Sequence, residues 1–309
     1  MGRMILGKAH THREISFSQW LDVHTSAIEV RQVLEMMTRL STYAADLDQL
    51  SAEAAIEQWR MGAKGVLYLD DGWSQLVRAL TEVAICEGVQ ICGGTSAQSV
   101  DQQLDGRWLV QLRTGELSAA TVIAAGLGPS SVEALLGGVS PAVQTWAADA
   151  VPIMAACLDV CLQRIPEPEQ RFGLGVDRPW YVSFHTPYAR LAPEGTGEVV
   201  HVAKYVPSVE LGRTPAQDRA ELEGVLDRMQ PGWRDVLVNA RYLHRMTVSH
   251  ATPAPGTSTT GRPTVDGAGI AGLLVAGDWV GAHGMLADAA LSSGAEAGRQ
   301  AAALAMMAA

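Results

Sequence analysis

Basic residues are the minority charge in this 309-residue sequence, which has 23 Lys and Arg against 33 Asp and Glu. The net charge of −10 repels nucleic-acid phosphates and anionic lipid head groups, so we expect neither as a partner. Long apolar runs are also lacking. The stretch at 270–276 is far shorter than the roughly 20 residues of a membrane span, and no signal-peptide pattern opens the sequence. These absences predict a cytoplasmic protein with no membrane span.

Cysteine is scarce, with Cys86, Cys92, Cys157 and Cys161 as the whole set. They form neither a CxxC pair nor a short secreted framework, which argues against disulfides and against a structural zinc site. We therefore expect free thiols and no bound metal. A G-x-S-x-G elbow and a P-loop are absent as well, so hydrolase and NTPase functions lack support.

The apolar patterns predict an α/β protein of mixed α+β character. The apolar residues of 18–60 recur at helical spacing, and shorter patterns typical of helices and of strands follow them. In the first half these are a strand at 65–69, a helix at 73–86, a strand at 89–92, and two alternating runs at 107–112 and 121–125. Residues 113–116 suit a hairpin turn between the two alternating runs.

Extended runs dominate the second half and predict a second sheet. Its strands are expected at 153–162, 180–184 and 199–206, with Pro-containing segments between them. A helix at 216–229, a polar loop at 251–263, a strand ending at Asp278 and a closing helix over 286–307 complete the predicted order.

Residues 267–272 match the dinucleotide-binding pattern G-x-G-x-x-G letter for letter. That pattern binds a diphosphate only when a strand precedes it and a helix begins within it. Here a polar loop precedes the glycines and a strand follows them. We therefore interpret them as a turn ahead of a buried strand.

The segment 273–294 carries the most chemical information. A buried strand delivers Asp278 to its end, a Gly-rich turn follows, and a helix begins near Met285 and Leu286. A carboxylate that accepts from hydroxyls and the free N–H groups of a helix N-terminus favour a polyhydroxylated or anionic ligand. A plain helix cap with ordinary strand-end polarity is the alternative.

This closing segment resembles the final flavin-binding motif of the FAD-dependent amine oxidase and phytoene desaturase superfamily. Four further stretches resemble the same family in the same order: 65–73 with the helix after it, 88–125, 180–205 and 231–250. The resemblance implies an incomplete FAD-binding Rossmann-like domain interleaved with a substrate domain of mixed sheet and helices. The implied parts are substrate-domain helices at 1–62, FAD-binding segments at 63–135 and 251–309, and a substrate domain with a sheet at 136–250.

The resemblance also implies site residues. The flavin ring is expected near Gly72, Trp73, Met285 and Leu286, its ribityl and phosphate part near Gly277 and Asp278, and its adenine near Ala97, which a plain turn explains equally well. Bulky or polar side chains of the substrate pocket are expected at Tyr43, Trp180, Phe184, His185 and Lys204. His185 and Lys204 have an alternative as satisfied polar groups of a sheet, and no catalytic residue is assigned.

One departure from the family limits this interpretation. The family begins with a strand, a Gly-rich turn and a helix that bind the ADP half of FAD, and this sequence shows no such unit. We expect FAD to bind weakly or not at all to this chain alone. Three functions stay open: an oxidoreductase acting on a small or medium apolar organic substrate, a cofactor-free binding protein derived from the fold, and one subunit of a split flavoenzyme. The chain is expected to form a homo-oligomer or to bind a complementing N-terminal FAD-binding subunit.

Overall fold

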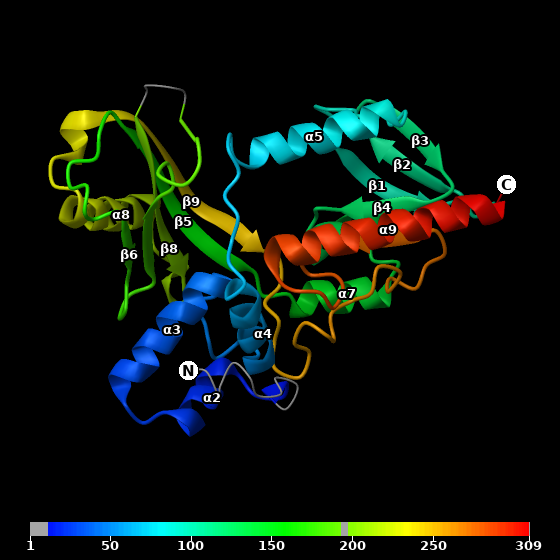
Figure 1. The fold of residues 1–309 in the computed structure, drawn as a ribbon. Coiled ribbons are helices and arrows are strands. Elements are labelled where there is room, and N and C mark those ends of the chain that lie inside the picture. Colours follow the sequence, from blue (N-terminus) through cyan, green and yellow to red (C-terminus); the bar gives the residue numbers. More distant parts are fainter. Residues whose placement is uncertain (1–11, 193–196, 309) are drawn as a thin grey trace.

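Three helices form the N-terminal part of the computed structural model, which describes residues 12–192 and 197–308 (Figure 1). They are α2 (Phe17–His24), α3 (Ile28–Thr42) and α4 (Ala52–Gly62). Ser16 and Gln19 form a capping box that fixes the start of α2. Phe17, Trp20 and Leu21 of α2 pack against Ile56 and Trp59 of α4, so the predicted helical opening has its own core.

A five-stranded antiparallel sheet with the strand order β6-β7-β8-β5-β9 forms the next part. Its strands are β5 (Ile153–Leu162), β6 (Phe172–Leu174), β7 (Trp180–Phe184), β8 (Glu198–Val206) and β9 (Leu237–Ser249). Helix α8 (Pro215–Met229) begins with a Thr214–Gln217 capping box and covers one face of this sheet (Figure 1). The sequence predicted β5, β7, β8 and α8 at these positions.

The third part contains a parallel pair of strands, β4 (Val122–Ala125) and β10 (Leu273–Ala276). The long helix α9 (Leu286–Ala308) packs against both strands. Two short helices that the sequence analysis missed, α6 (Pro129–Leu136) and α7 (Pro141–Asp149), contribute Val132, Leu136 and Val143 to the same core. The G-x-G-x-x-G match falls in turns before β10, where Gly269 and Gly272 have φ of 70° and 75°. No helix begins within it.

A small antiparallel sheet of β1 (Ala97–Gln102), β2 (Trp108–Leu112) and β3 (Gly115–Ala119) corrects one prediction. The turn at 113–114 joins β2 to β3, and not to the run at 121–125. That run is β4, which lies in the other sheet beside β10. β3 was not predicted from the sequence, because its side chains are mostly exposed and show little alternation.

Residues 65–69 and 89–92 were predicted to be strands, and the structure shows neither. Both segments are extended and exposed, with Leu67 95% and Ile91 56% accessible. A strand exists only through hydrogen bonds to a neighbouring strand, and no described strand pairs with either segment. Between them α5 (Trp73–Cys86) forms as predicted, but none of its residues is buried.

Two absences expected from the sequence can be examined over the described residues. All four cysteines are free thiols, with Cys86 and Cys92 exposed. Among the described helices, none combines the length and the apolar character that crossing a membrane requires.

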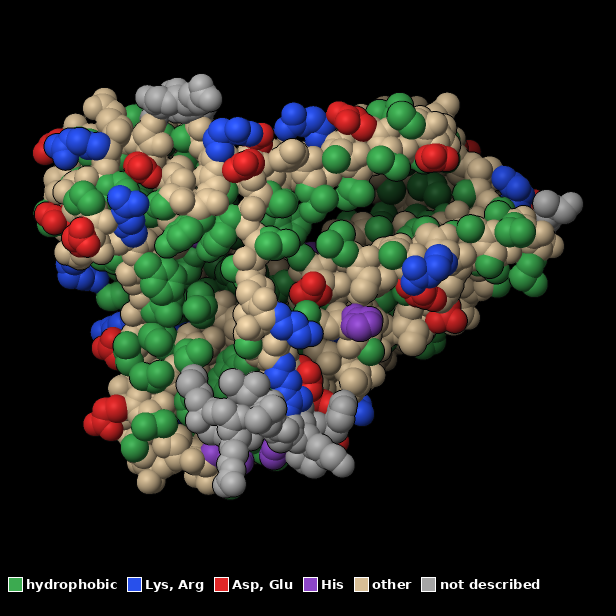
Figure 2. Space-filling view, viewed as in Figure 1, with side chains coloured by type: hydrophobic (Ala, Val, Ile, Leu, Met, Phe, Trp, Pro, Cys, Tyr) green, Lys and Arg blue, Asp and Glu red, His purple; other side chains and the backbone are tan. Residues whose placement is uncertain are grey.

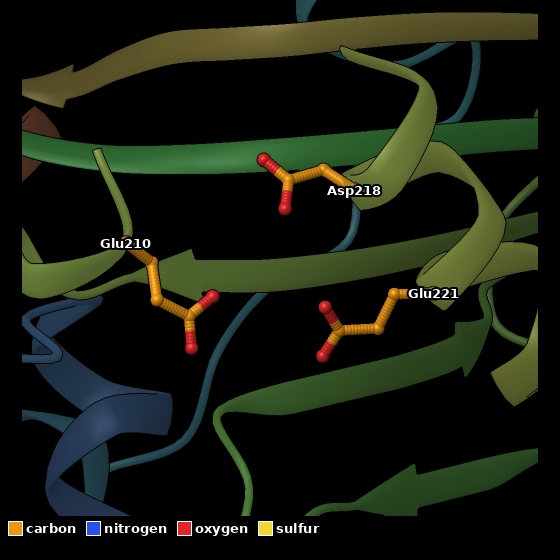
Figure 3. A group of neighbouring side chains, drawn as sticks. All are labelled: Glu210, Asp218 and Glu221. Carbon is orange, nitrogen blue, oxygen red and sulfur yellow. The ribbon is translucent and has the colours of Figure 1, made fainter. Parts of the chain in front are cut away.

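Lys204 lies beneath α8 in an ion-pair cluster with Glu210, Asp218 and Glu221. Figure 3 shows the three carboxylates of this cluster. Its ammonium group lies 3.3 Å from Asp218 and 2.7 Å from Glu221, and it also contacts Glu210. Arg213 donates to Asp218 at 2.6 Å and to Glu221 at 2.7 Å. The three carboxylates have a spacing that could hold a metal ion, but the ammonium group of Lys204 bonds to all of them.

Burial opposes ionisation of Asp218 and Glu221, but their bonds to Arg213 and Lys204 outweigh it, so the pKa of each carboxyl is lowered. Burial lowers the pKa of Lys204, but the carboxylates of Glu210 and Glu221 outweigh it, so that the pKa of Lys204 is raised. At neutral pH all of these groups are therefore charged, and they fasten β8 to α8.

We predict that Lys204→Met lowers the free energy of unfolding by about 3–5 kcal/mol at pH 7, because three carboxylates lose their buried counter-ion. In the unfolded chain Asp218 and Glu221 have pKa values of 3.8 and 4.5, and the fold lowers both. The two ionised carboxylates therefore stabilise the fold at a pH above these unfolded-state values, and this stabilisation is lost as the pH falls through the lower pKa values of the folded state. The gap between wild type and variant should therefore narrow between pH 7 and pH 3. Urea unfolding at each pH measures this difference in the free energy of unfolding. Lys64→Met, which removes an exposed lysine, is the control. A gap that stays constant with pH would contradict the assignment.

Candidate functional site

The turn between β10 and α9 is fixed by two side chains that the sequence analysis did not single out. The Ser293 hydroxyl accepts from the Gly277 N–H and donates to the Gly277 carbonyl, both at 3.0 Å. The buried Arg262 guanidinium donates to the carbonyls of Asp278 and Gly284, one at each end of the turn. Burial lowers the pKa of Arg262 to about 10, so it remains charged at neutral pH. The turn is therefore held rigidly before any ligand arrives.

Asp278 stands at the end of β10, where the sequence placed it, and both of its oxygens already accept hydrogen bonds. His250 donates to them from its backbone N–H and from Nδ1, each at 2.8 Å. The carboxylate therefore ties the end of β9 to the end of β10. A ligand hydroxyl would have to share these oxygens with His250.

Met285 and Leu286 mark the start of α9, and their side chains point into the core of the N-terminal helices. Met285 is 2% exposed, while Gly284 and Leu286 have φ of 57° and 56°. Positive φ is costly for a residue such as leucine, so the surrounding core must impose it. What this place can offer a ligand is its backbone N–H groups and the positive end of the α9 dipole.

A cavity of about 260 Å³ lies between α4 and this turn. Glu53, Glu57 and Met61 of α4 form one wall, and His283 and Gly284 of the turn form another. The cavity adjoins the N-terminus of α9.

Gly72 and Trp73 lie at the far end of the extended segment 65–72, which crosses from α4 to α5 (Figure 1). Their neighbours bond to Arg190 in the segment after β7: the Asp70 carboxylate accepts from the Arg190 N–H at 2.8 Å, and the Asp71 N–H donates to the Arg190 carbonyl at 2.7 Å. No hydrogen bond among the described residues joins Gly72 or Trp73 to Met285. Ala97 begins β1 and is exposed.

A group of aromatic and titratable side chains gathers on the sheet face opposite α8. We call it the tyrosine–histidine face: Tyr43, Tyr68, Asp159, Tyr181, His185, His201 and Tyr205. The Tyr181 hydroxyl lies 2.9 Å from His185 Nε2, and the ring centroids of His185 and His201 are 4.7 Å apart. His201 donates from Nδ1 to Asp159 at 2.7 Å. Tyr68 of the extended segment lies 5.0 Å from His185, ring to ring.

Burial sets the charge of this face. Desolvation is the main cause that lowers the pKa of His185 to about 4. The neighbouring His201 lowers this pKa further, and Asp159 has the opposite, smaller effect. Desolvation likewise raises the pKa of Tyr181 to about 12 and that of the adjacent Cys157 thiol to about 11. At neutral pH the imidazole of His185, the Tyr181 hydroxyl and the thiol are therefore uncharged.

The structure divides the predicted pocket residues between the two faces of the sheet. Tyr43 and His185 lie on the tyrosine–histidine face, whereas Trp180 and Phe184 pack beneath α8 and Lys204 lies in the ion-pair cluster there. Strand alternation explains the division, because side chains of even and odd residues of β7 point to opposite faces. The same alternation could have identified Tyr181, which was not predicted from the sequence, and neither were Tyr68 and Asp159.

Comparisons with known proteins agree with this architecture. No protein-family model matches the sequence, and no curated protein is similar to it. Among solved structures, an oxidoreductase from Methanosarcina mazei matches 92% of this chain and 68% of its own with 17% identity and a TM-score of 0.68.

Two amine oxidases have structures that are similar to this chain at slightly lower TM-scores. Cyclohexylamine oxidase from Brevibacterium oxydans matches 96% of this chain and 68% of its own, with 12% identity and a TM-score of 0.64. Putrescine oxidase, solved with putrescine bound, matches 96% and 69%, with 13% identity and a TM-score of 0.63. The chain thus has the fold of the FAD-dependent oxidoreductases of amine oxidase type, as the resemblance implied.

The lowered pKa of His185 generates a test. In the unfolded chain this imidazole has a pKa of 6.5, whereas the folded state keeps it neutral down to a pH of about 4. Between these two values the unfolded state binds a proton that the folded state does not, so the protein loses stability as the pH falls from about 6.5 towards 4. We predict that His185→Gln loses less stability than wild type between pH 7 and pH 5 in urea unfolding. Exposed His283→Gln is the control for removing a histidine. Equal losses in wild type and His185→Gln would show that His185 is not held neutral.

Proposed function

We propose that this chain carries the substrate side and the flavin-ring side of an FAD-dependent oxidoreductase. The observation on which the proposal rests is the turn between β10 and α9, held by Arg262 and Ser293 within an amine oxidase-type fold. Such a turn presents the N-terminus of a long helix at the end of a buried parallel strand. That arrangement is suited to an electron-rich ligand oxygen.

The described residues fit one end of FAD better than the other. At the flavin end, the first-turn N–H groups of α9 would donate to ring or ribityl oxygens, and Gly72 with Trp73 would border the ring. At the adenine end, the sequence pattern G-x-G-x-x-G for the diphosphate falls in the turns before β10, where no helix begins. When bound, the flavin would supply two-electron oxidation of an organic substrate.

The tyrosine–histidine face is the proposed substrate side. The rings of Tyr43 and Tyr68, which are 37% and 44% exposed, offer apolar surface to a small or medium organic molecule, and the buried ring of Tyr205 packs edge-on against Tyr43. Because His201 donates Nδ1–H to Asp159, its Nε2 is the nitrogen left to accept a proton. We assign it the removal of a substrate proton, and we assign to Asp159 the orientation of His201.

We also propose that the protein works in the cytoplasm. Two of its four free cysteines are exposed, and thiols persist in a reducing compartment.

Titration with FAD and with riboflavin tests the cofactor proposal. Because the described residues supply contacts for the ring and ribityl parts alone, we predict weak binding of both with similar dissociation constants. Trp73→Ala should weaken both by about 2–10-fold, the worth of an aromatic contact of roughly 0.5–1.5 kcal/mol. Quenching of flavin fluorescence measures the affinity, and the fully exposed Leu104→Ala is the control.

Two results would overturn the proposal. If neither flavin binds, a cofactor-free binding protein becomes the better account. If FAD binds far more tightly than riboflavin, the chain also holds the ADP half of the cofactor, through residues outside the turn between β10 and α9.

A further inference from the structure

The extended segment 65–72, which we call the strap, crosses from α4 to α5 (Figure 1). None of its residues, all of which the structure describes, lies in a strand. Figure 2 shows the strap at the surface, with hydrophobic side chains gathered on both sides of it. Val66 and Leu67 are 71% and 95% exposed, so they contribute little to any core. Tyr68 differs from them, because its ring packs against other aromatic side chains.

Tyr68 lies over the tyrosine–histidine face, although it comes from outside the sheet. Its ring centroid is 5.0 Å from that of His185, and it stacks on Tyr188 at 5.7 Å with an interplanar angle of 21°. Burial is the main cause that raises the pKa of Tyr43 and of Tyr181, and the electrostatic effect of Tyr68 adds to it in both. Tyr68 is therefore close to a tyrosine of α3 and to a tyrosine of the sheet.

Arg190, in the segment after β7, holds the strap in this position. Its backbone N–H donates to the Asp70 carboxylate at 2.8 Å, and its carbonyl accepts from the Asp71 N–H at 2.7 Å. Its guanidinium also pairs with the Asp71 carboxylate at 3.2 Å. The two side chains of this ion pair are 57% and 48% exposed, so the pair adds only modestly to the two backbone bonds.

Backbone strain is concentrated around the same site. Of the four non-glycine residues with positive φ in the described chain, three lie there: Tyr43 at 62°, Asp71 at 60° and Leu286 at 56°. Such conformations persist only where the surrounding structure imposes them, and they gather at ligand sites. Tyr43 at the end of α3 and Tyr68 on the strap thus reach the tyrosine–histidine face from constrained backbone.

The floor and the wall of this face have different origins. The side chains of the floor project from β5, β7 and β8, whose positions the sheet hydrogen bonds fix. Tyr68 comes from a segment that pairs with no described strand, so removing its ring enlarges the space over His185 and leaves the sheet unchanged. A side chain of this kind can exclude a ligand by steric clash, which is one way in which a site obtains specificity.

We propose that Tyr68 is a specificity-determining residue whose ring limits the size of the organic molecule that can lie on the tyrosine–histidine face, and that Arg190 is the positioning residue that keeps it there. The inference rests on the proposed function for the role of this face as the substrate side. It adds the substrate class, a molecule with a single ring at the end that enters, because a fused pair of rings would overlap Tyr68. The size limit can be measured without flavin, so the two proposals can fail separately.

The experiment compares two uncharged probes, benzyl alcohol and the two-ring naphthylmethanol, on the purified full chain. NMR titration gives both dissociation constants, and the Cε1–H resonance of His201, assigned with His201→Gln, shows whether a probe lies on this face. We expect the wild type to bind benzyl alcohol roughly tenfold more tightly than naphthylmethanol. Tyr68→Ala should reduce this preference to about twofold or less, because the clash with the second ring is removed.

Three variants test the role of the ring and of its support. Tyr68→Phe keeps the ring and should restore the preference of the wild type. Leu67→Ala, at the 95% exposed neighbour on the same strap, is the matched control and should also keep it. Arg190→Met loses the ion pair and keeps both backbone bonds, so it should reduce the preference by a smaller factor of roughly two. Circular dichroism checks that each variant is folded.

Several results would overturn the proposal. Equal affinity of the wild type for both probes, a preference that survives Tyr68→Ala, or binding that leaves His201 unshifted would reject the role of Tyr68. A preference unchanged in Arg190→Met would reject the role of Arg190. Binding of neither probe would reject this inference together with the proposed substrate side, whereas the flavin titration would still decide the cofactor proposal. A preference controlled by Tyr68 in a chain that binds no flavin would uphold this inference and reject the proposed cofactor.

Discussion

The antiparallel pairing of β5 with β9 is the interaction on which the two halves of the structure depend. β5 begins at Ile153, which packs into the core of the N-terminal helices, and its later residues contribute to the core under α8. β9 runs beside it and delivers His250 to Asp278 at the end of β10. The pair therefore connects the sheet that carries the proposed substrate side to the turn proposed to face the flavin (Figure 1).

Alternation along these strands separates structure from chemistry. One face of the sheet packs beneath α8 with Leu158, Val202 and the compensated charge of Lys204. The opposite face gathers side chains that burial keeps neutral, such as His185 and Tyr181, beside the Asp159–His201 pair. Beneath α8 the buried charge of Lys204 is thus held among carboxylates, whereas on the opposite face burial keeps the side chains of His185 and Tyr181 neutral.

Elements with a strong period were predictable from the sequence, and those defined by a distant partner were not. β5, α8 and α9 matched their patterns because each buries a face within the described chain. Residues 89–92 have the composition of a strand, but a strand also needs a neighbour, which sequence spacing cannot supply. In the site, Asp278 could be located because it ends a buried strand. Its engagement by His250 and the clamp of Arg262 could not, because both partners are distant in sequence.

The central claim is that the tyrosine–histidine face and the α9 N-terminus serve one flavin site. The most direct measurement is a crystal structure of the chain soaked with riboflavin. The account predicts a ring bordered by Gly72 and Trp73 on one side and by the first turn of α9 on the other, with one face of the ring turned towards His201. A ring bound elsewhere, or a site in which His201 lies beyond reach of the flavin and any substrate between them, would contradict the account.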